Sequence, residues 1–228
     1  MKMGIRAYVF DAYGTLFDVG SPVRQCAESL GPDALRLAAI WREKQLQYTW
    51  LRSLQGRFAD FAQVTADALD HALACLRRED PGLRERLLQA YRTPCVYPEV
   101  RPTIEVLRAR GVRTAILSNG TTEWLNAAIR CNGLEEMFDA VLSADAVQVY
   151  KPHPAVYGLA ERALLVSAGQ ISFQSSNGWD AWSASAYGMR AVWCNRSGQA
   201  PEFLPEAPEH TISALDEILR LPPFLSDR

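Results

Sequence analysis

The chain has 228 residues, of which 48% are hydrophobic and 22% are charged, and its formal net charge is −2. This composition is typical of a globular protein that is one domain with an insertion, or two small domains. The small net charge and the lack of a Lys/Arg-rich run argue against nucleic-acid binding. No apolar run reaches the ~18–20 residues of a membrane span, and the apolar start lacks a cleavage site, so we expect neither a membrane segment nor a signal peptide.

The cysteines and histidines are too scattered to form a metal cluster or a disulfide framework. No Cys-x-x-Cys pair occurs, and the three histidines are far apart in the sequence. This usage of cysteine suits a reducing cytoplasm, where we expect the protein to reside. The cysteines are Cys26, Cys75, Cys95, Cys131 and Cys194, and the histidines are His71, His153 and His210.

Residues 5–10 predict a short buried parallel strand, because the run is brief, mostly apolar and closed by a turn signal. Asp11 follows it directly, and Gly14 then permits a tight turn before Thr15. Ligands of open α/β sheets bind at the carboxyl ends of the strands, so Asp11 faces an expected site. The alternative is that Asp11 only accepts hydrogen bonds from local backbone amides, as aspartates in turns often do.

Residues 21–97 show helical periodicity instead of strand patterns. Asp33 and Asp60 are expected N-caps of two helices, residues 80–82 break the pattern, and 83–91 form a third helix. A helical stretch inserted directly after the first strand predicts a cap subdomain. We therefore expect a cap at 21–97 and a core formed by 1–20 and 98–228.

The alternation expected of a parallel sheet resumes after residue 98. The fold class is therefore α/β, with a doubly wound, Rossmann-like parallel sheet and an inserted helical cap. Pro222-Pro223 should end a closing helix at 215–221. The other predicted helices cover 103–110, about 122–129, 154–165 and 178–187, and the predicted strands cover 112–117, 140–142, 171–173 and 191–193.

Polar side chains lie in four of the predicted connections, on the side of the sheet where the strands have their carboxyl ends. By the strand-end rule they should converge in one crevice under the cap. One such residue is weak support, but four connections that agree are much stronger. The residues are Asp11, Ser118 with Asn119, Lys151, and Ser175, Asn177 and Asp180.

These groups suit covalent catalysis by a carboxylate. A carboxylate that is screened from water is a competent nucleophile, and it forms an ester that water later hydrolyses. Lys151 would keep Asp11 ionised and anchor an anionic substrate. Ser118, Asn119 and Thr15 suit the positioning of ligand oxygens or a leaving anion. Taken singly, Lys151 also fits a solvated surface lysine, and Ser118-Asn119 fits a helix cap.

Four stretches, in this order and spacing, resemble the haloacid dehalogenase superfamily: Asp11-x-Tyr13-Gly14-Thr15, Ser118-Asn119, Lys151-Pro152 and Ser175-Ser176-Asn177-x-x-Asp180. The likeness extends along the whole chain and includes the helical cap. Within the superfamily the chain is most similar to the (S)-2-haloacid dehalogenases, also called L-2-haloacid or type II dehalogenases. Their hallmark stretches match residues 11–19, 41–46 and 175–180.

This resemblance implies hydrolysis of short (S)-2-haloalkanoic acids to (R)-2-hydroxy acids with inversion. Asp11 would attack C2 and form an ester, which water positioned by Asp180, with help from Asn177 and Ser175, would hydrolyse. The substrate carboxylate would be held by four groups. These are Lys151, Ser118 and the backbone amides of Ala12 and Tyr13.

The resemblance also assigns a halide cradle to Arg42 on the cap, with Asn119. Without the surrounding motif, Arg42 fits an exposed helix arginine. Tyr157 would hydrogen-bond into the site, although a half-buried helix aromatic fits it nearly as well. Tyr13, Leu46, Phe61 and Trp179 match positions that line the alkyl pocket, although such aromatics usually serve the core. Glu43 stands where relatives are expected to carry Gln, and it either alters halide preference or faces solvent.

The superfamily is mostly phosphatases, and a Mg²⁺-dependent phosphatase is the main alternative. Phosphatases carry a general acid two residues after the nucleophile, where this chain has Tyr13, a phenol that cannot do that work near neutral pH. They also use several acids of the last motif to hold Mg²⁺, and only Asp180 is present here. A catalytically silent binding protein is the other alternative. The resemblance implies no cofactor or metal, the haloacid and halide as ligands, and a homodimer.

Overall fold

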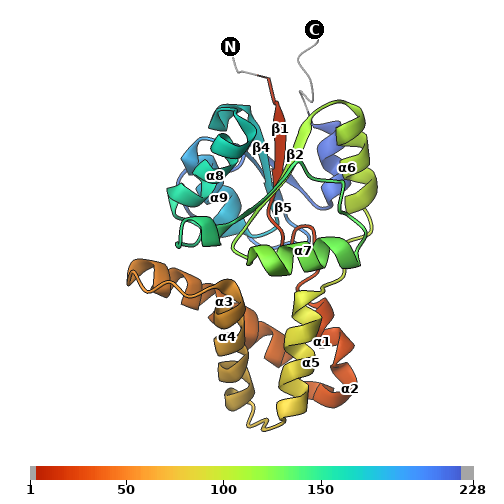
Figure 1. The fold of residues 1–228 in the computed structure, drawn as a ribbon, viewed down its shortest axis with the longest axis vertical. Coiled ribbons are helices and arrows are strands. Elements are labelled where there is room, and N and C mark those ends of the chain that lie inside the picture. The colour runs from red at the N-terminus through yellow and green to blue at the C-terminus, as the bar shows by residue number, and fades with distance from the viewer. Residues whose placement is uncertain (1–3, 222–228) are drawn as a thin grey trace.

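The structure, a computed structural model, describes residues 4–221, and its central element is a parallel sheet of six strands (Figure 1). The strand order is β3-β2-β1-β4-β5-β6, which confirms the predicted doubly wound α/β fold. The strand β6 was not predicted, because three residues carry too little pattern. The strands are β1 (Ala7–Phe10), β2 (Arg113–Ser118), β3 (Ala140–Ser143), β4 (Ile171–Ser175), β5 (Arg190–Cys194) and β6 (His210–Ile212).

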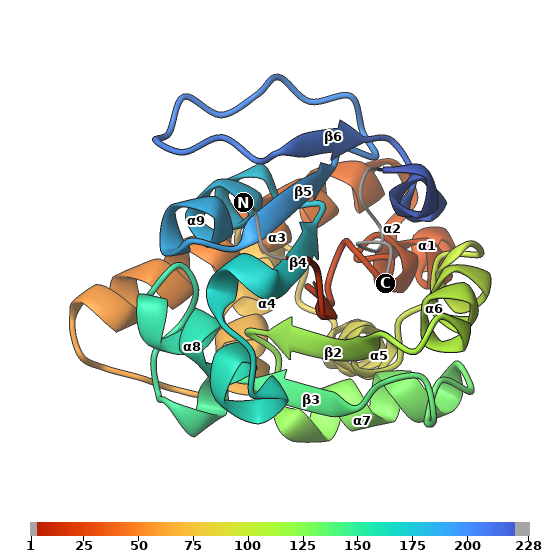
Figure 2. The ribbon, with the colours of Figure 1, turned by 90° about the horizontal axis from the view of Figure 1, so that it is seen from above.

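Helices cover both faces of the sheet (Figure 2). The helices α8 (Pro154–Leu164) and α9 (Gly178–Tyr187) lie on one face, and α6 (Val100–Ala109) lies on the other with the 3₁₀ helix η4 (Leu215–Arg220). All residues of β1 are buried, as expected for a strand covered on both faces. The closing helix predicted at 215–221 is present as the 3₁₀ helix η4. Pro222-Pro223, which were expected to end it, lie outside the described residues.

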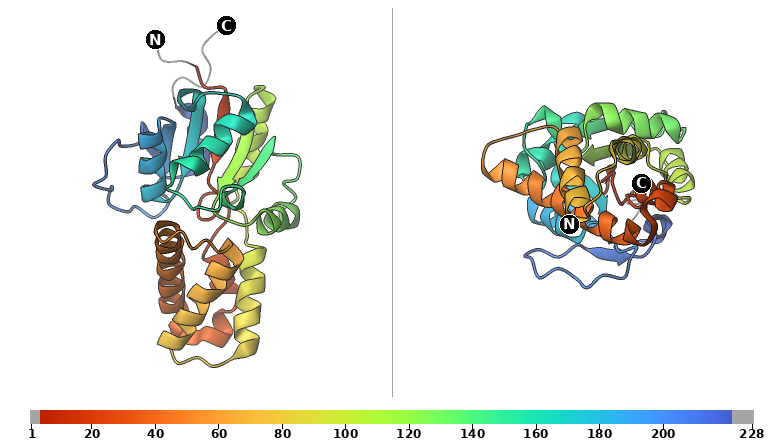
Figure 3. Two further views of the ribbon diagram at one scale, coloured as in Figure 1. Left: turned by 60° about the vertical axis from the view of Figure 1, so that its left-hand side comes forward. Right: turned by 90° about the horizontal axis from the view of Figure 1, so that it is seen from below.

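A helical bundle stands beyond the carboxyl ends of the strands, between β1 and α6 in the sequence (Figure 3). The long helix α3 packs along α4, and α5 contacts α7 of the core. No described helix combines the length and the apolarity that crossing a membrane requires. The bundle helices are α1 (Ser21–Gln25), α2 (Ala27–Leu30), α3 (Ala34–Leu54), α4 (Phe61–Cys75) and α5 (Pro81–Arg92), with the 3₁₀ turn η1 (Gly31–Asp33). The helix α7 (Thr122–Cys131) and the 3₁₀ turns η2 (Ala144–Ala146) and η3 (Ala168–Gln170) belong to the part of the chain that forms the sheet.

Of the two aspartates predicted to cap helices, one makes the expected hydrogen bond with its side chain. The Asp60 carboxylate accepts a hydrogen bond from the backbone N–H of Gln63 at 2.8 Å, which caps α4 as predicted. Asp33 also occupies an N-cap position, but its side chain makes no capping bond. Because its backbone is helical (φ −80°, ψ −10°), its carboxylate turns away and pairs with Arg78 at 2.6 Å. The prediction that Asp33 caps α3 is wrong in this respect.

Two linkers join the bundle to the sheet and lie side by side. The backbone N–H of Asp18 donates to the carbonyl of Cys95 at 2.8 Å, and that of Tyr97 donates to Leu16 at 3.0 Å. Arg196, which follows β5, donates to the carbonyl of Thr15 at 2.8 Å and stacks over the Tyr97 ring at 3.9 Å. These contacts fix the loop after β1 against both linkers, and so position the residues that follow Asp11.

Candidate active site

The candidate site lies where the strand order reverses, between β1 and β4. The two strands pair directly, and the backbone N–H of Asp11 donates to the carbonyl of Gln174 at 2.9 Å. In doubly wound sheets the connections diverge at this point and leave a crevice for a ligand. The loop after β1 carries Asp11 and Thr15, and the turn after β4 carries Asn177 and Asp180. The sequence therefore places these groups together by topology.

The two oxygens of the Asp11 carboxylate have different hydrogen-bond partners. Oδ2 accepts hydrogen bonds from Thr15 Oγ1 (3.0 Å), Asn177 Nδ2 (2.8 Å) and, at the longer distance of 3.5 Å, Ser175 Oγ. The Thr15 hydroxyl accepts from the backbone N–H of Ser176 at 2.8 Å, so its own proton is free for Asp11. Among residues 4–221, Oδ1 accepts a hydrogen bond only from Lys151 Nζ, at 3.1 Å. Donors thus hold Oδ2, while Oδ1 keeps an available lone pair.

Lys151 bridges Asp11 to Asp180 inside the protein. Its Nζ lies 2.9 Å from Asp180 Oδ2, and the lysine and Asp180 side chains are 1% and 0% exposed. Burial alone would lower the pKa of Lys151, but the two carboxylates outweigh it and raise that pKa. Burial raises the pKa of Asp180, which the Lys151 cation opposes and Asp11 reinforces. Tyr157 donates to Asp180 Oδ1 at 2.7 Å, and both burial and Asp180 raise the pKa of that phenol.

A residue of the helical bundle also reaches this network. Arg42, on α3, donates to Asn177 Oδ1 at 2.9 Å, and the same amide donates from Nδ2 to Asp11. The structure does not pair Arg42 with Asn119, whose Oδ1 accepts from the backbone N–H of Lys151 at 2.9 Å. The joint cradle of Arg42 with Asn119 thus stays a prediction. Glu43, the next residue on α3, is exposed. Of the two roles expected for it, the structure therefore supports a side chain that faces solvent over one that alters halide preference.

Three further predicted residues lie at the carboxyl ends of β1 and β2. The hydroxyl of Ser118 accepts from the backbone N–H of Gly120 at 3.0 Å, which shapes the turn after β2. The backbone N–H groups of Ala12 and Tyr13 find no acceptor among residues 4–221, although both residues are buried. Two buried N–H donors without a partner are unusual, and they are available to bind an anion.

Aromatic rings from the loop after β1 and from the helical bundle pack together beside these polar groups. Tyr13 stacks on Tyr91 with ring centroids 5.3 Å apart and lies 5.4 Å from Phe61. The Tyr13 hydroxyl is buried without a hydrogen-bond partner in the described structure, and burial raises its pKa well above the ordinary value. Leu46 is half-buried on α3.

Trp179 belongs to a different aromatic contact, between the helical bundle and the part of the chain that forms the sheet. It packs edge-on against Trp50 of α3 at 5.4 Å, and the two rings line a hollow of about 520 Å³. Tyr150 and Lys151 also line this hollow, so it adjoins the site. The structure therefore places Trp179 beside the Asp180 network but not in the ring cluster of Tyr13.

Sequence reasoning missed two cap residues of the site. Gln45 accepts from Arg42 at 2.8 Å, and Tyr91 donates to the same Gln45 oxygen at 3.0 Å. Gln45 stands inside the 41–46 stretch, but its type alone indicated no role. Tyr91 ends a helix with an ordinary apolar pattern, and nothing in the sequence distinguishes it from a core aromatic.

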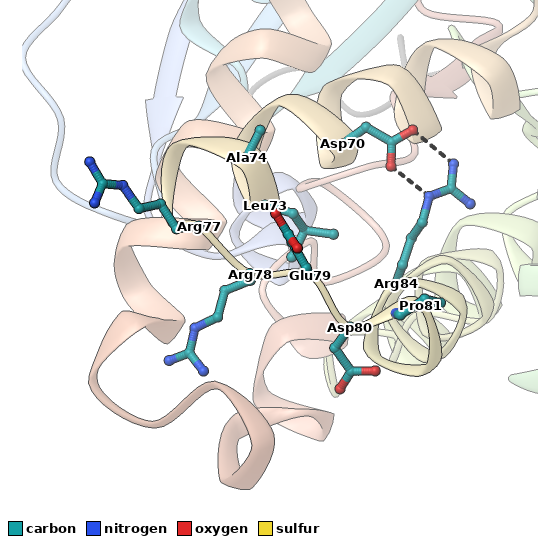
Figure 4. A pocket seen from close by; sticks show the side chains of 9 residues that line it. All are labelled: Asp70, Leu73, Ala74, Arg77, Arg78, Glu79, Asp80, Pro81 and Arg84. Atoms are coloured by element: carbon teal, nitrogen blue, oxygen red, sulfur yellow. Dashed lines mark hydrogen bonds and ion pairs between the residues drawn. The ribbon is translucent and has the colours of Figure 1, made fainter.

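A second hollow, of about 540 Å³, lies between α4 and α5 at the end of the bundle away from the sheet (Figure 4). Two of its three arginines pair with carboxylates, because Arg84 binds Asp70 through Nε at 2.5 Å and Nη2 at 2.9 Å, and Arg78 binds Asp33. This hollow offers no group that resembles a reacting centre. Among residues 4–221, no three His, Cys, Asp or Glu side chains gather as a metal site requires.

Comparison with known proteins identifies relatives of this arrangement. A family model for haloacid dehalogenase-like hydrolases matches residues 5–188. The chain is 42% identical to (S)-2-haloacid dehalogenase 4A of Burkholderia cepacia, over 96% of this chain and 95% of that protein. It is 44% identical to (S)-2-haloacid dehalogenase 1 of a Pseudomonas species (strain CBS-3), over 95% of this chain and 96% of that protein.

A solved structure agrees over nearly the whole fold. L-2-haloacid dehalogenase from Xanthobacter autotrophicus, with chloropropionic acid covalently bound, superposes with a TM-score of 0.89 at 36% identity, and the match covers 95% of this chain and 98% of that chain. The sequence identity, the coverage and the shared fold lead to one conclusion. The chain belongs to the haloacid dehalogenase-like hydrolases.

Proposed function

We propose that the protein is an (S)-2-haloacid dehalogenase, which hydrolyses short (S)-2-haloalkanoic acids to (R)-2-hydroxy acids. The observation that carries this proposal is the Asp11 carboxylate. Thr15 and Asn177 donate to one of its oxygens, and within the described part of the chain Lys151 is the only donor to the other. That arrangement suits a nucleophile whose second oxygen later becomes a stabilised carbonyl oxygen. The named relatives, 42% and 44% identical, are (S)-2-haloacid dehalogenases.

In the first step Asp11 Oδ1 attacks C2 of the substrate from the side opposite the halogen. The new C–O bond forms as the carbon–halogen bond breaks, so the centre inverts and the halide leaves with the bonding electron pair. The substrate carboxylate binds the free N–H groups of Ala12 and Tyr13, with Lys151 and Ser118. Preorganised donors are needed where the halide develops charge, and Arg42 supplies a cation there from the cap.

In the second step water attacks the carbonyl carbon of the Asp11 ester, and Asp180 takes the proton. Negative charge then develops on Oδ2, where Thr15 and Asn177 already donate at 3.0 and 2.8 Å and Ser175 lies at 3.5 Å. Collapse of this intermediate releases the hydroxy acid and restores the carboxylate. Tyr157 and Lys151 hold the Asp180 carboxylate in place through the step.

The remaining site residues form the apolar wall for the alkyl group. Tyr13 and Phe61 supply a buried ring surface, with ring centroids 5.4 Å apart. Trp179 lines the adjoining hollow, and Leu46 is assigned to the wall by the family resemblance. The phosphatase alternative is not favoured, because burial keeps the Tyr13 phenol protonated and hence unable to serve a leaving alcohol as a readily ionised acid.

We further infer a two-part organisation, a homodimer and a cytoplasmic location. The helices between Ser21 and Arg92 support a cap at 21–97 on a core of 1–20 and 98–228. Leu35 and Leu54, near the two ends of α3, are 86% and 85% exposed, which supports association through this helix. All five cysteines are free, which supports a reducing compartment. Light scattering of the purified protein tests the dimer, and a monomer at micromolar concentration would contradict it.

Halide release from separate (S)- and (R)-2-chloropropionate, in excess EDTA, tests the function. We expect release from the (S) enantiomer alone, with (R)-lactate as product. No release from either enantiomer, together with Mg²⁺-dependent hydrolysis of p-nitrophenyl phosphate, would overturn the proposal in favour of the phosphatase. Tight binding of small carboxylates without any turnover would instead indicate a binding protein.

A further inference from the structure

Gln45 occupies the junction of the three main cap helices, directly behind Arg42. Its side chain is 1% exposed on α3, its amide N–H donates to Thr65 Oγ1 of α4 at 2.7 Å, and its carbonyl accepts from Tyr91 of α5 at 3.0 Å. The same carbonyl accepts from Arg42 Nη1 at 2.8 Å. Every polar atom of this buried side chain therefore has a partner.

The orientation of the Gln45 amide is determined by its neighbours. Arg42 and Tyr91 both lie on the oxygen side, and an arginine has only donors. Burial raises the pKa of the Tyr91 phenol, so it stays protonated and also donates. The reversed amide would place an N–H₂ group against two donors. Gln45 must therefore present its oxygen to Arg42, which holds the guanidinium toward Asn177.

The acceptors of Arg42 are neutral. Its guanidinium donates to the amide oxygens of Gln45 and Asn177, at 2.8 and 2.9 Å, and forms no ion pair with any carboxylate among residues 4–221. By contrast, Arg52 on the same helix pairs with Asp67 at 2.7 Å. An arginine whose acceptors are all neutral keeps its attraction for an anion, whereas a carboxylate partner would cancel most of it.

We propose that Gln45 is a positioning residue that fixes Arg42 through a neutral acceptor and so reserves the guanidinium charge for the departing halide. This inference rests on the proposed function, because Arg42 faces a halide only if Asp11 displaces one. The inference also explains why position 45 carries an amide rather than a carboxylate of the same shape. A glutamate would make the same contacts but would pair with Arg42 as an anion.

The test compares Gln45→Glu with the control Thr65→Val. The glutamate keeps the acceptor for Arg42 and Tyr91, and the Thr65 hydroxyl can rotate to donate to it. The valine keeps the shape of Thr65 and removes its hydrogen bond with Gln45 without changing the charge near Arg42. Three quantities are measured for each protein: the melting temperature, inhibition by bromide, and the ratio of kcat/KM for (S)-2-bromopropionate to that for (S)-2-chloropropionate.

For Gln45→Glu we expect bromide inhibition to weaken about 10-fold or more, which is the effect of losing one hydrogen bond to a charged group. The bromo-to-chloro ratio should rise, because chloride is the poorer leaving group and needs more stabilisation. Thr65→Val should lower the melting temperature but keep the wild-type bromide inhibition and ratio. A Gln45→Glu protein that matches Thr65→Val in both halide measurements would overturn the inference and leave Gln45 a purely structural link.

Two additions keep the test decisive. If Gln45→Glu does not fold, Gln45→Met removes the acceptor without adding charge, and unchanged bromide inhibition in that variant would overturn the inference. Chlorine NMR line broadening measures halide binding without turnover. Wild-type protein that binds chloride but releases no halide from any 2-haloacid would refute the proposed function, while weaker chloride binding by Gln45→Glu would still support the role of Gln45.

Discussion

Replacing Lys151 with methionine tests whether the buried cation between two carboxylates supports the fold as well as the chemistry. Lys151 lies 3.1 Å from Asp11 and 2.9 Å from Asp180, and the Asp180 side chain is fully buried. Methionine fills a similar volume but leaves both carboxylates without their cation. Removing one partner of a buried ion pair costs about 3–5 kcal/mol of stability, because the remaining charge stays desolvated. For a chain of this size that corresponds to a fall in Tm of roughly 6–20 °C.

The loss should depend on pH with a definite sign. Burial already raises the pKa of Asp180, and Lys151 opposes that rise, so the variant should have a still higher Asp180 pKa. A carboxyl group with a raised pKa binds its proton more tightly in the folded state than in the unfolded state. Between the two pKa values the free energy of unfolding therefore falls as pH rises. The deficit of Lys151→Met should be larger at neutral pH than near about pH 5.

Urea unfolding of the wild type and Lys151→Met at the two pH values measures this deficit. A matched double variant, Lys151→Met with Asp180→Asn, removes one buried charge, so it should recover part of the stability and show a weaker pH dependence. A deficit under about 1 kcal/mol at neutral pH, or one that grows on acidification, would refute the reasoning.

Three further predictions concern the chemistry and the wall of the site. Asp180→Asn should release halide in one turnover and then stop, because the ester is not hydrolysed, and intact-protein mass spectrometry should detect the adduct; steady turnover would remove Asp180 as the base. In a plot of kcat against pH, the raised pKa of Asp180 should place the fall on the acid side above the ordinary carboxyl range. The raised pKa of Lys151 should keep kcat constant on the alkaline side up to about pH 10. A fall of kcat at the pH of an ordinary carboxyl group would contradict this. Gly120→Ala should destabilise the protein by about 1–3 kcal/mol and raise KM, since the new methyl would lie 2.6 Å from a ring carbon of buried Tyr13; unchanged stability would show that the ring can yield.

The convergence of the polar groups was predictable because parallel strands bring their carboxyl ends to one edge. Asp11, Lys151 and Asp180 each follow a strand or lie in a connection on that side, and the structure joins them through one ammonium group. Topology determined this outcome more than any single residue type. The prediction therefore needed only correct strand boundaries to within a residue or two.

The cap contribution was harder to predict, because helix packing is not encoded in strand order. Arg42 has the pattern of an exposed helix arginine, and only the family resemblance placed it at the site. The contacts of Gln45 with Tyr91 join residues 46 positions apart on two helices whose relative rotation the sequence does not fix. The same limit applies to Asn119, which bonds the Lys151 backbone rather than Arg42.

Covalent catalysis by Asp11 is tested most directly by one turnover in water labelled with heavy oxygen, using excess protein over (S)-2-chloropropionate. Attack by Asp11 followed by hydrolysis at its carbonyl carbon transfers a carboxylate oxygen to the product and leaves solvent oxygen on Asp11. We predict unlabelled lactate and a peptide containing Asp11 that carries the label. Labelled lactate with an unlabelled peptide would mean that water attacks C2 directly, and it would contradict the ester mechanism.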